Sequence, residues 1–343
     1  MFQGASGEIP LDFLQFTKSP NQADFLMLPH NYFSLKRLGE EKSSGYISGF
    51  VTLAEQFKKK ILVFEMADSD AHIDIPHAII FRYSQYRYKK RDNEIITPPY
   101  PPHFRPVGLD EWRSSVWKNV SLRKKRERPV VSFCGWAGFP SFYRWLIYQA
   151  KNFFVLIQFL MGNTHAPLHG SGIYWRRRAL RALAHPTAVD TRFIIRKSYS
   201  AQKGLDGANR IDPKHAEKEY VENISNSDFV LAPKGHGNAS VRFFEALSLG
   251  RIPVLINTEC VLPLEKFVDY SKFIVDVDYT RVDKTEQEIM NFYTPLSGEE
   301  FKERQKMARA AFELLRPGSF LKVILSELKK KETGSNYNAN YAK

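Results

Sequence analysis

Only two cysteines occur among the 343 residues, which excludes a disulfide framework and a metal site with four cysteine ligands. Cys134 and Cys260 lie in or beside apolar stretches, and we expect both to be buried thiols. The first ten residues contain neither a basic segment nor an apolar run, which predicts that there is no signal peptide and no N-terminal anchor. The simplest interpretation of these absences is a cytoplasmic protein.

The sequence also lacks the familiar glycine motifs of nucleotide-binding proteins, and it has no internal repeat. The glycines at 235 and 237 are not followed by the Gly-Lys-Ser/Thr of a P-loop, and G-x-G-x-x-G spacing is absent there. The chain does have a globular composition, with 43% hydrophobic and 25% charged residues. Its length suffices for two hydrophobic cores.

The formal net charge of +13 calls for an anionic partner, which is a nucleic acid, an anionic lipid or a charged glycan. A basic run at residues 122–128 has no interleaved aromatic residues and no nucleic-acid-binding signature around it. We therefore expect this run to be a solvated linker between two halves of the protein, and we expect no nucleic-acid partner.

The stretch from 227 to 276 predicts a strand, a glycine-bearing turn, a helix and a second strand. Its first apolar run leads into a loop at 234–237 that brings backbone N–H groups close to a ligand. Asn238 or Ser240 is expected to cap the helix, which ends at Gly250.

A glycine loop that leads into a helix N-terminus favours anion binding, because free N–H groups and the positive end of the helix dipole meet there. Arg242 and Glu245 are three residues apart and therefore share one face of this helix. The arginine suits a phosphate and the glutamate suits the two hydroxyls of a ribose, which together describe a nucleotide diphosphate. The alternative is an ordinary crossover helix with a surface Arg–Glu pair.

The same stretch resembles the exostosin family of glycosyltransferases. The family pattern joins an apolar strand, a Pro-x-Gly loop, Ser-x-Arg-x-x-Glu-Ala, a glycine before Ile-Pro-Val, and a Leu-Pro ahead of an aromatic-Ser-Lys-Phe. The matching residues are Ser227, Phe229, Leu231, Pro233, Gly235, Ser240, Arg242, Glu245, Ala246, Gly250, Ile252, Pro253, Val254, Leu262, Pro263, Tyr270, Ser271, Lys272 and Phe273. The resemblance implies a GT-B fold, two Rossmann-like domains facing across a cleft, and a metal-independent, inverting transfer from a nucleotide sugar.

On this resemblance we expect a UDP-sugar donor, a glycan or polysaccharide acceptor, and neither a further cofactor nor a metal. The residues expected to bind the donor are Lys234, Gly235, Asn238, Ser240, Arg242 and Glu245. Many retaining GT-B enzymes have a second glutamate eight residues before the equivalent of Glu245. Gly237 stands at that place here, which favours inversion.

Alternating strands and helices predict an open parallel sheet in each half. Residues 1–125 are expected to form the acceptor-side Rossmann-like domain and residues 126–330 the donor-binding domain, whose last helices are able to pack back on the first. The polar tail at 331–343 is expected to be frayed. The polar loop at 82–105 is expected to shape an acceptor groove or to be a long surface connection. Strands are expected at 24–28, 61–64, 78–81, 130–134 and 192–195, and helices at 46–60, 142–161, 283–292, 298–315 and 318–330.

An inverting transfer needs a base for the proton of the acceptor hydroxyl. Asp68 and Asp70, after the second predicted strand, are the expected catalytic residues, and His72 is a third candidate. One alternative is a single-domain GT-A enzyme, because such enzymes hold Mn²⁺ with an Asp-x-Asp like this one. Another is a non-catalytic glycan- or lipid-binding protein on the same scaffold.

Residues 142–161 are rich in aromatic and aliphatic side chains. Polar residues, among them Arg144 and Lys151, interrupt them too often for a comfortable membrane span, so the stretch predicts an interfacial or a buried helix. The arginines at 176–181 follow Tyr174 and Trp175 and predict a basic amphipathic helix that rests on anionic lipid or faces solvent or the nucleotide cleft. Peripheral attachment to the inner face of a membrane is therefore a further expectation.

Overall fold

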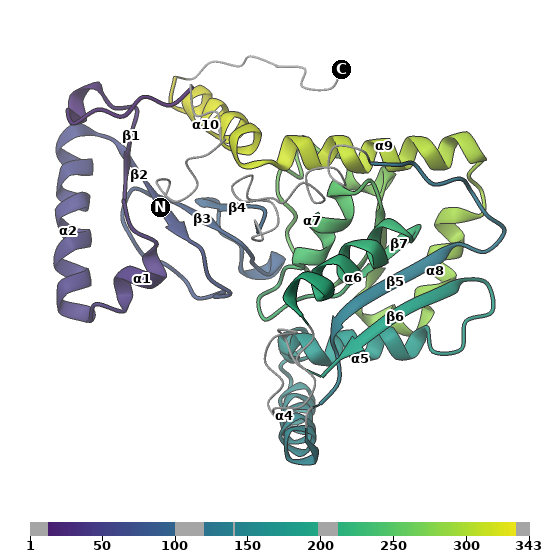
Figure 1. Ribbon diagram of the computed structural model, residues 1–343. Helices are drawn as coiled ribbons and strands as arrows, with labels where there is room; N and C mark the ends of the chain where they lie inside the picture. Colours follow the sequence, from purple (N-terminus) through teal and green to yellow (C-terminus); the bar gives the residue numbers. More distant parts are fainter. Residues whose placement is uncertain (1–12, 100–119, 140, 198–211, 334–343) are drawn as a thin grey trace. The chain divides into compact units, whose positions relative to one another are not determined.

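The computed structural model describes residues 13–99, 120–139, 141–197 and 212–333 (Figure 1). The chain divides into two compact units, one formed by residues 1–114, 260–269 and 313–343 and the other by 115–259 and 270–312. The sequence predicted one cut at 125/126, whereas the segments 260–269 and 313–343 return to the first unit. The first ten residues, Pro98–Pro102 in part and most of the 331–343 tail lie outside the described residues.

The first unit is built on a four-stranded sheet with the order β1-β2-β3-β4, in which every neighbouring pair is parallel. Its apolar strand residues form the core together with one side of the long second helix. Its elements are η2 (Pro20–Gln22), β1 (Phe25–Met27), α1 (Tyr32–Lys36), α2 (Glu40–Phe57), β2 (Lys60–Glu65), β3 (Ala78–Arg82), η3 (Arg87–Lys89), β4 (Glu94–Ile96) and α10 (Pro317–Thr333).

Two elements of this unit differ from the prediction. Helix α2 begins at Glu40, six residues before the predicted start, because Gly39 adopts a φ of 96° at the N-cap and two glutamates in the first turn suit the helix dipole. Strand β4 lies inside the loop predicted at 82–105. Its Glu94 pairs with Arg82 of β3 in the core, and this long-range pair leaves no local pattern in the sequence.

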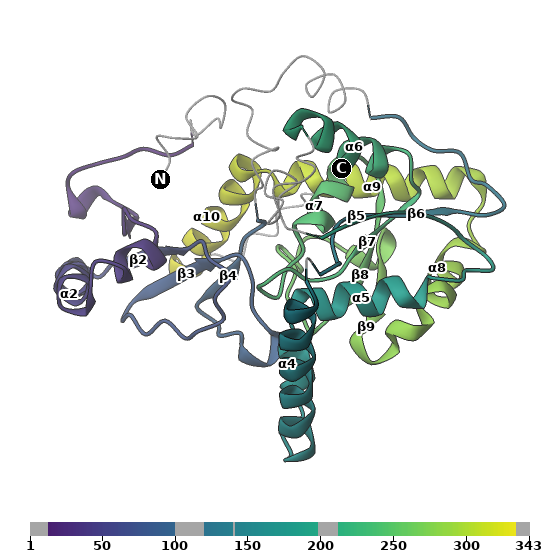
Figure 2. The same ribbon diagram turned by 60° about the horizontal axis from the view of Figure 1, so that its bottom comes forward.

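The second unit has a five-stranded parallel sheet with the order β6-β5-β7-β8-β9. Helices α5 and α8 lie on one face of the sheet, and α6 and α7 lie on the other (Figures 1 and 2). Its elements are β5 (Val130–Trp136), α4 (Phe142–Leu160), η5 (Ala166–His169), α5 (Gly172–Ala182), β6 (Asp190–Arg196), α6 (Pro213–Ser225), β7 (Phe229–Ala232), α7 (Val241–Ser248), β8 (Ile252–Asn257), η6 (Tyr270–Lys272), β9 (Val275–Asp278), η7 (Tyr279–Lys284), α8 (Thr285–Tyr293) and α9 (Gly298–Leu315). Two parallel α/β units confirm the prediction of a two-domain fold of the GT-B kind.

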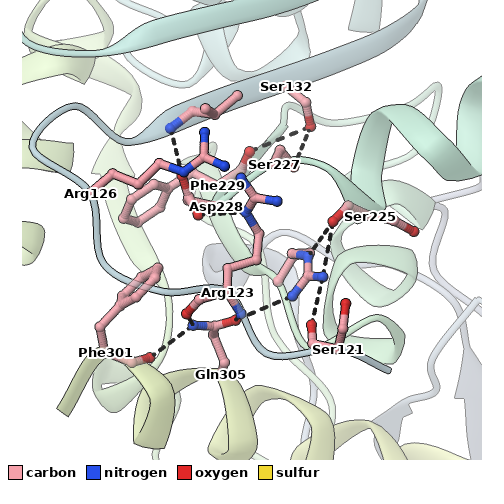
Figure 3. A network of polar contacts seen from close by, with 12 residues as sticks. Ser121, Arg123, Arg126, Ser132, Ser225, Ser227, Asp228, Phe229, Phe301 and Gln305 are labelled. Atoms are coloured by element: carbon pink, nitrogen blue, oxygen red, sulfur yellow. Dashed lines mark hydrogen bonds and ion pairs between the residues drawn. The ribbon is translucent and has the colours of Figure 1, made fainter. Parts of the chain in front are cut away.

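A polar network ties this sheet together at the amino ends of its strands (Figure 3). Arg123 Nε donates to one carboxylate oxygen of Asp228 at 2.8 Å, and the Val130 N–H donates to the other at 2.8 Å. Arg251 donates to the Ser225 carbonyl oxygen and to Gln305 Oε1. Burial, and secondly the charge of Arg123, lowers the pKa of Arg251 to about 10. The network therefore joins the segments ahead of β5, β7 and β8 to helix α9 and stabilises the fold of this unit.

The basic run at 122–128 belongs to this network, so the prediction of a solvated linker is wrong for its packed members. Besides Arg123, Lys125 donates from Nζ to the carbonyl oxygens of Thr294 and Leu296. The backbone N–H of Arg126 donates to the Tyr293 hydroxyl at 2.7 Å. These cations hold the chain segment ahead of β5 against α8 and α9.

Helix α4 is not the buried helix of the two alternatives predicted, because none of its residues is buried. Both views show it extending away from the sheet of the second unit (Figures 1 and 2). In the described part of the chain, every helix is too short or too polar to cross a bilayer.

Candidate functional site

The predicted donor residues gather at the carboxyl ends of β5 and β7. The strand order reverses at this pair, since β6 lies on the far side of β5 while β7, β8 and β9 follow on the other side. In open parallel sheets, ligands bind in the crevice at such a switch point. The loop after β7 and the N-terminus of α7 lie at this place, beside the end of β5.

Two side chains and one backbone hydrogen bond hold the loop after β7 in place. Lys234 is buried and donates from Nζ to the Leu168 carbonyl oxygen at 2.7 Å. Asn238 donates from Nδ2 to the Thr258 carbonyl oxygen at 3.0 Å and accepts the Thr258 hydroxyl at 2.5 Å. The Gly235 N–H donates to the Ala239 carbonyl oxygen at 2.7 Å. Asn238 is thus a loop anchor.

Ser240 occupies the N-cap position of α7, but its side chain makes no capping hydrogen bond. The prediction of the cap position is therefore correct for Ser240 and wrong for Asn238. The helix ends at Ser248, and Gly250 follows with a φ of 63°, as expected of a residue that closes a helix in the left-handed region.

The Lys234–Gly235 segment lies directly against the start of α5. A Cβ atom on Gly172 would lie 2.8 Å from the Gly235 carbonyl carbon and 2.9 Å from the Lys234 carbonyl oxygen. These are backbone atoms, which cannot swing aside as a flexible side chain does. Gly172 therefore lets α5 support the loop at a distance that no other residue type permits.

Arg242 extends from the first turn of α7 toward β5. Its Nη2 donates to the Cys134 carbonyl oxygen at 2.8 Å, and its guanidinium carbon lies 4.4 Å from the centre of the Phe133 ring. Its Nε is buried without a hydrogen-bond partner, and no carboxylate of the described residues pairs with it. A Cβ atom on Gly135 would lie 2.6 Å from Nη2, so this glycine makes room for the arginine.

Glu245 lies one turn further along the helix and is 5% exposed. It accepts the hydroxyl of Tyr220, which comes from α6. Burial, and secondly the Glu245 charge, raises the pKa of Tyr220 well above its usual value, so the tyrosine remains a hydrogen-bond donor. Arg242 and Glu245 therefore do not form the surface ion pair that the alternative interpretation predicted.

Sequence reasoning missed Tyr220 and the contribution of Cys134. Tyr220 lies in a helix with mixed polarity and carries no motif that signals a role. Burial raises the pKa of the Cys134 thiol, which keeps it protonated, and the neighbouring Arg196 and Arg242 oppose this effect. Cys134 takes part through its carbonyl oxygen, which a sequence motif does not reveal.

The predicted acceptor-side residues lie in the loop after β2 in the first unit. Asp68 is exposed, and Asp70 accepts a salt bridge from Lys89 Nζ at 2.6 Å. His72 lies 2.7 Å from Arg91 Nη1 through its Nε2. Residues 13–99, 120–139, 141–197 and 212–333 contain no group of three or more His, Cys, Asp or Glu residues placed to hold a metal ion.

A further carboxylate stands at the end of β2. Glu65 is 3% exposed, and its Oε2 has no hydrogen-bond partner. Burial raises its pKa, while Arg82 and the Phe33 backbone N–H partly oppose this shift. Arg82 itself pairs with Glu94 at 2.5 Å. Glu65 is therefore a buried acid with one oxygen left for another partner.

Residues 179–293, about a third of the chain, match the family model described as the Exostosin GT47 domain. The chain is 38% identical over 73 residues to Exostosin-1 of Drosophila melanogaster and 33% identical over 72 residues to an Exostosin-1 homolog of Caenorhabditis elegans. These alignments cover 20% and 21% of this chain and 10% and 19% of the relatives. The matched segments thus span a fifth or less of the curated relatives.

Two solved structures are similar in outline. One is S. aureus TarM in complex with fondaparinux, alpha-GlcNAc-glycerol and UDP, at 10% identity and a TM-score of 0.36, over 87% of this chain and 57% of that chain. The other is the catalytic domain of starch synthase IV from Arabidopsis thaliana bound to ADP and acarbose, at 10% identity and a TM-score of 0.29, over 87% and 79%. Similarities this low carry no argument about the site.

Proposed function

We propose that the protein is a glycosyltransferase that moves a sugar from a nucleotide sugar, a UDP-sugar, to a glycan or polysaccharide acceptor with inversion. The observation that carries this proposal is Arg242. Among the described residues this cation has no carboxylate partner, and it is fixed at the switch point of the sheet and at the start of α7. It lies inside the part of the chain that matches the Exostosin GT47 domain.

The donor fits this place through its diphosphate and its ribose. Arg242 and the N-terminus of α7 offer positive charge and N–H groups to the diphosphate, whose negative charge grows as it leaves. Lys234 adds a second cation close to the loop. Glu245 accepts the ribose hydroxyls, and the Tyr220 hydroxyl fixes the orientation of its carboxylate.

The acceptor reacts by direct displacement. Its hydroxyl oxygen forms the new bond to the anomeric carbon, the bond to the diphosphate oxygen breaks, and the hydroxyl proton passes to a carboxylate. Asp68 and Asp70 remain our candidates for that base, and Glu65 joins them because of its unpartnered oxygen. We propose that turnover needs no metal, because fixed cations serve the leaving group.

Calorimetry of UDP binding to the purified protein tests this proposal. Arg242→Ala should lose about 1.5–3 kcal/mol of binding free energy, the range for a charge-assisted hydrogen bond. The matched control is Arg181→Ala, which removes an exposed arginine of the same unit. Unchanged UDP affinity in folded Arg242→Ala would refute the assignment. UDP binding without sugar transfer to any acceptor tested would favour the non-catalytic alternative.

A further inference from the structure

The apolar side chains exposed on this protein are concentrated on one element. Of the 21 large hydrophobic residues that are exposed in the described part of the chain, 11 lie on α4 and its C-cap. A soluble monomer rarely exposes a large contiguous apolar patch, and such a patch marks an interaction surface. The 11 residues are Phe142, Tyr143, Leu146, Ile147, Phe153, Phe154, Leu156, Ile157, Phe159, Leu160 and Met161.

The rest of the second unit covers one side of α4 only. Asn152, Val155 and Phe159 line a small groove together with Pro167 and Tyr174. Nearer the start of the helix, the Tyr148 ring packs on Phe139 at 4.9 Å. The opposite side has no neighbour among the described residues of this unit, and Phe153 and Phe154 are 64% and 60% exposed there.

Three of the polar residues of α4 lie along one line of the helix. Arg144, Lys151 and Gln158 follow each other at intervals of seven residues, which places them on one edge of the exposed face. A helix of 19 residues is about 28 Å long. An apolar face with cations along its edge is the form of a helix that lies in the plane of a membrane interface.

The positive charge around α4 favours a membrane with anionic lipids. Residues 128–189 contain seven arginines and lysines and neither aspartate nor glutamate. Arg177 of α5 lies beside the base of α4, since its guanidinium stacks on the Phe139 ring at 5.0 Å. Within the described ranges, no carboxylate pairs with Arg144, Lys151 or Arg177. Their charges are therefore free to attract anionic headgroups.

We infer that α4 binds the surface of an anionic lipid bilayer. Its exposed apolar face enters the boundary between headgroups and acyl chains, and Arg144, Lys151 and Arg177 contact lipid phosphates. A neutral bilayer satisfies only the apolar part of this surface. The inference does not depend on the proposed sugar transfer, because none of these residues belongs to the donor loop.

Vesicle flotation with the full chain tests this inference. Wild-type protein should float with vesicles of phosphatidylglycerol and phosphatidylcholine, and less with phosphatidylcholine alone. High salt should weaken flotation, because ions screen surface charge. Arg144→Gln with Lys151→Gln should weaken partitioning to anionic vesicles by roughly thirtyfold, since each surface cation contributes about fivefold.

A second variant tests the contribution of the exposed apolar face of α4. Phe153→Glu with Phe154→Glu should abolish flotation at every salt concentration. Leu38→Glu with Leu53→Glu is the matched control, because it adds the same charges at exposed apolar positions of the first unit. Equal thermal unfolding temperatures establish that all variants are folded.

Three outcomes would overturn the inference, the first two in flotation and the third in solution. The first is flotation by Phe153→Glu/Phe154→Glu that equals that of the wild-type protein, and the second is no flotation of the wild-type protein on anionic vesicles at low salt. The third is a dimer in lipid-free analytical ultracentrifugation that the same glutamates dissociate, because the apolar face would then be covered by a second copy of the chain.

Discussion

The buried position of Glu65 lowers the stability of the folded protein when its carboxyl group is ionised. Glu65 ends a buried strand, its pKa is raised by burial, and one of its oxygens has no hydrogen-bond partner. A buried ionised group without full pairing lowers stability. Residues that carry such a cost are frequent at functional sites, because chemistry and not stability keeps them there.

This cost gives Glu65→Gln a definite pH dependence. The folded-state pKa lies above the unfolded value, so the carboxyl group favours folding below the unfolded pKa, and this contribution is lost as the pH rises through the folded pKa. Denaturant unfolding should therefore show Glu65→Gln gaining stability relative to wild type as the pH rises from about 4 to 8. A relative loss of stability over that range would show that the carboxylate is well paired. A simultaneous fall in transfer activity would identify Glu65 as the base.

Single residues also mark the limit of what the sequence predicts. The motif identified Arg242 and Glu245 because their spacing is local. It did not identify the Cys134 carbonyl oxygen or the Tyr220 hydroxyl. These groups belong to β5 and α6, and only the folded arrangement of the strands and helices brings them next to Arg242 and Glu245. Nor did the motif indicate that Lys234, assigned to the ligand, donates from its Nζ to the Leu168 carbonyl oxygen.

At the scale of elements, the contact between α5 and the loop after β7 is tightly constrained. Gly172→Ala places a methyl group against the Lys234–Gly235 backbone, so the loop or the helix must shift. We expect a loss of about 1–3 kcal/mol in the free energy of unfolding, as for other overpacked sites. UDP affinity should fall as well, because the loop leads into α7.

A glycine in open surroundings is the control for Gly172→Ala. Gly49 lies in α2 with no atom within 4 Å of an added Cβ. Gly49→Ala should stabilise the protein by about 0.5–1 kcal/mol, because alanine loses less chain entropy in a helix. If the two substitutions changed the unfolding temperature and the UDP affinity equally, the close approach of Gly172 to the Lys234–Gly235 backbone would be contradicted.

Long apolar runs account for the elements that were predicted well. The strands β2, β5 and β8 each contain four or more successive buried residues, and such runs are typical of strands in parallel sheets. Strand β4 has three residues, begins with a glutamate and follows a polar loop. Its partner Arg82 is twelve positions away, so neither periodicity nor composition indicates the pair.

For the whole molecule, the role of metal separates two mechanisms of sugar transfer. The two parallel α/β units argue against the single-domain GT-A alternative. If fixed cations stabilise the leaving diphosphate, transfer should continue in excess EDTA. Loss of activity that Mn²⁺ restores would contradict the proposed mechanism.

Substitution of the two candidate aspartates tests the role of metal independently of EDTA. Asp68→Asn or Asp70→Asn should lower kcat by about 10²–10⁴, the usual contribution of a general base, with near-normal UDP affinity. Asp92→Asn, an exposed aspartate of the same unit, is the control. Loss of UDP binding together with kcat would indicate metal ligands.

Two later segments of the chain, 260–269 and 313–343, belong to the first unit. This division determines where a chimera with a related protein can be joined. Exchange of the second unit as an intact module requires four junctions, at 114/115, 259/260, 269/270 and 312/313. A single crossover near residue 125 would separate Arg87 from Glu265 and Asp24 from Lys329, pairs that lie within the first unit. Chimeras joined at one point should therefore inherit mismatched halves of the first unit.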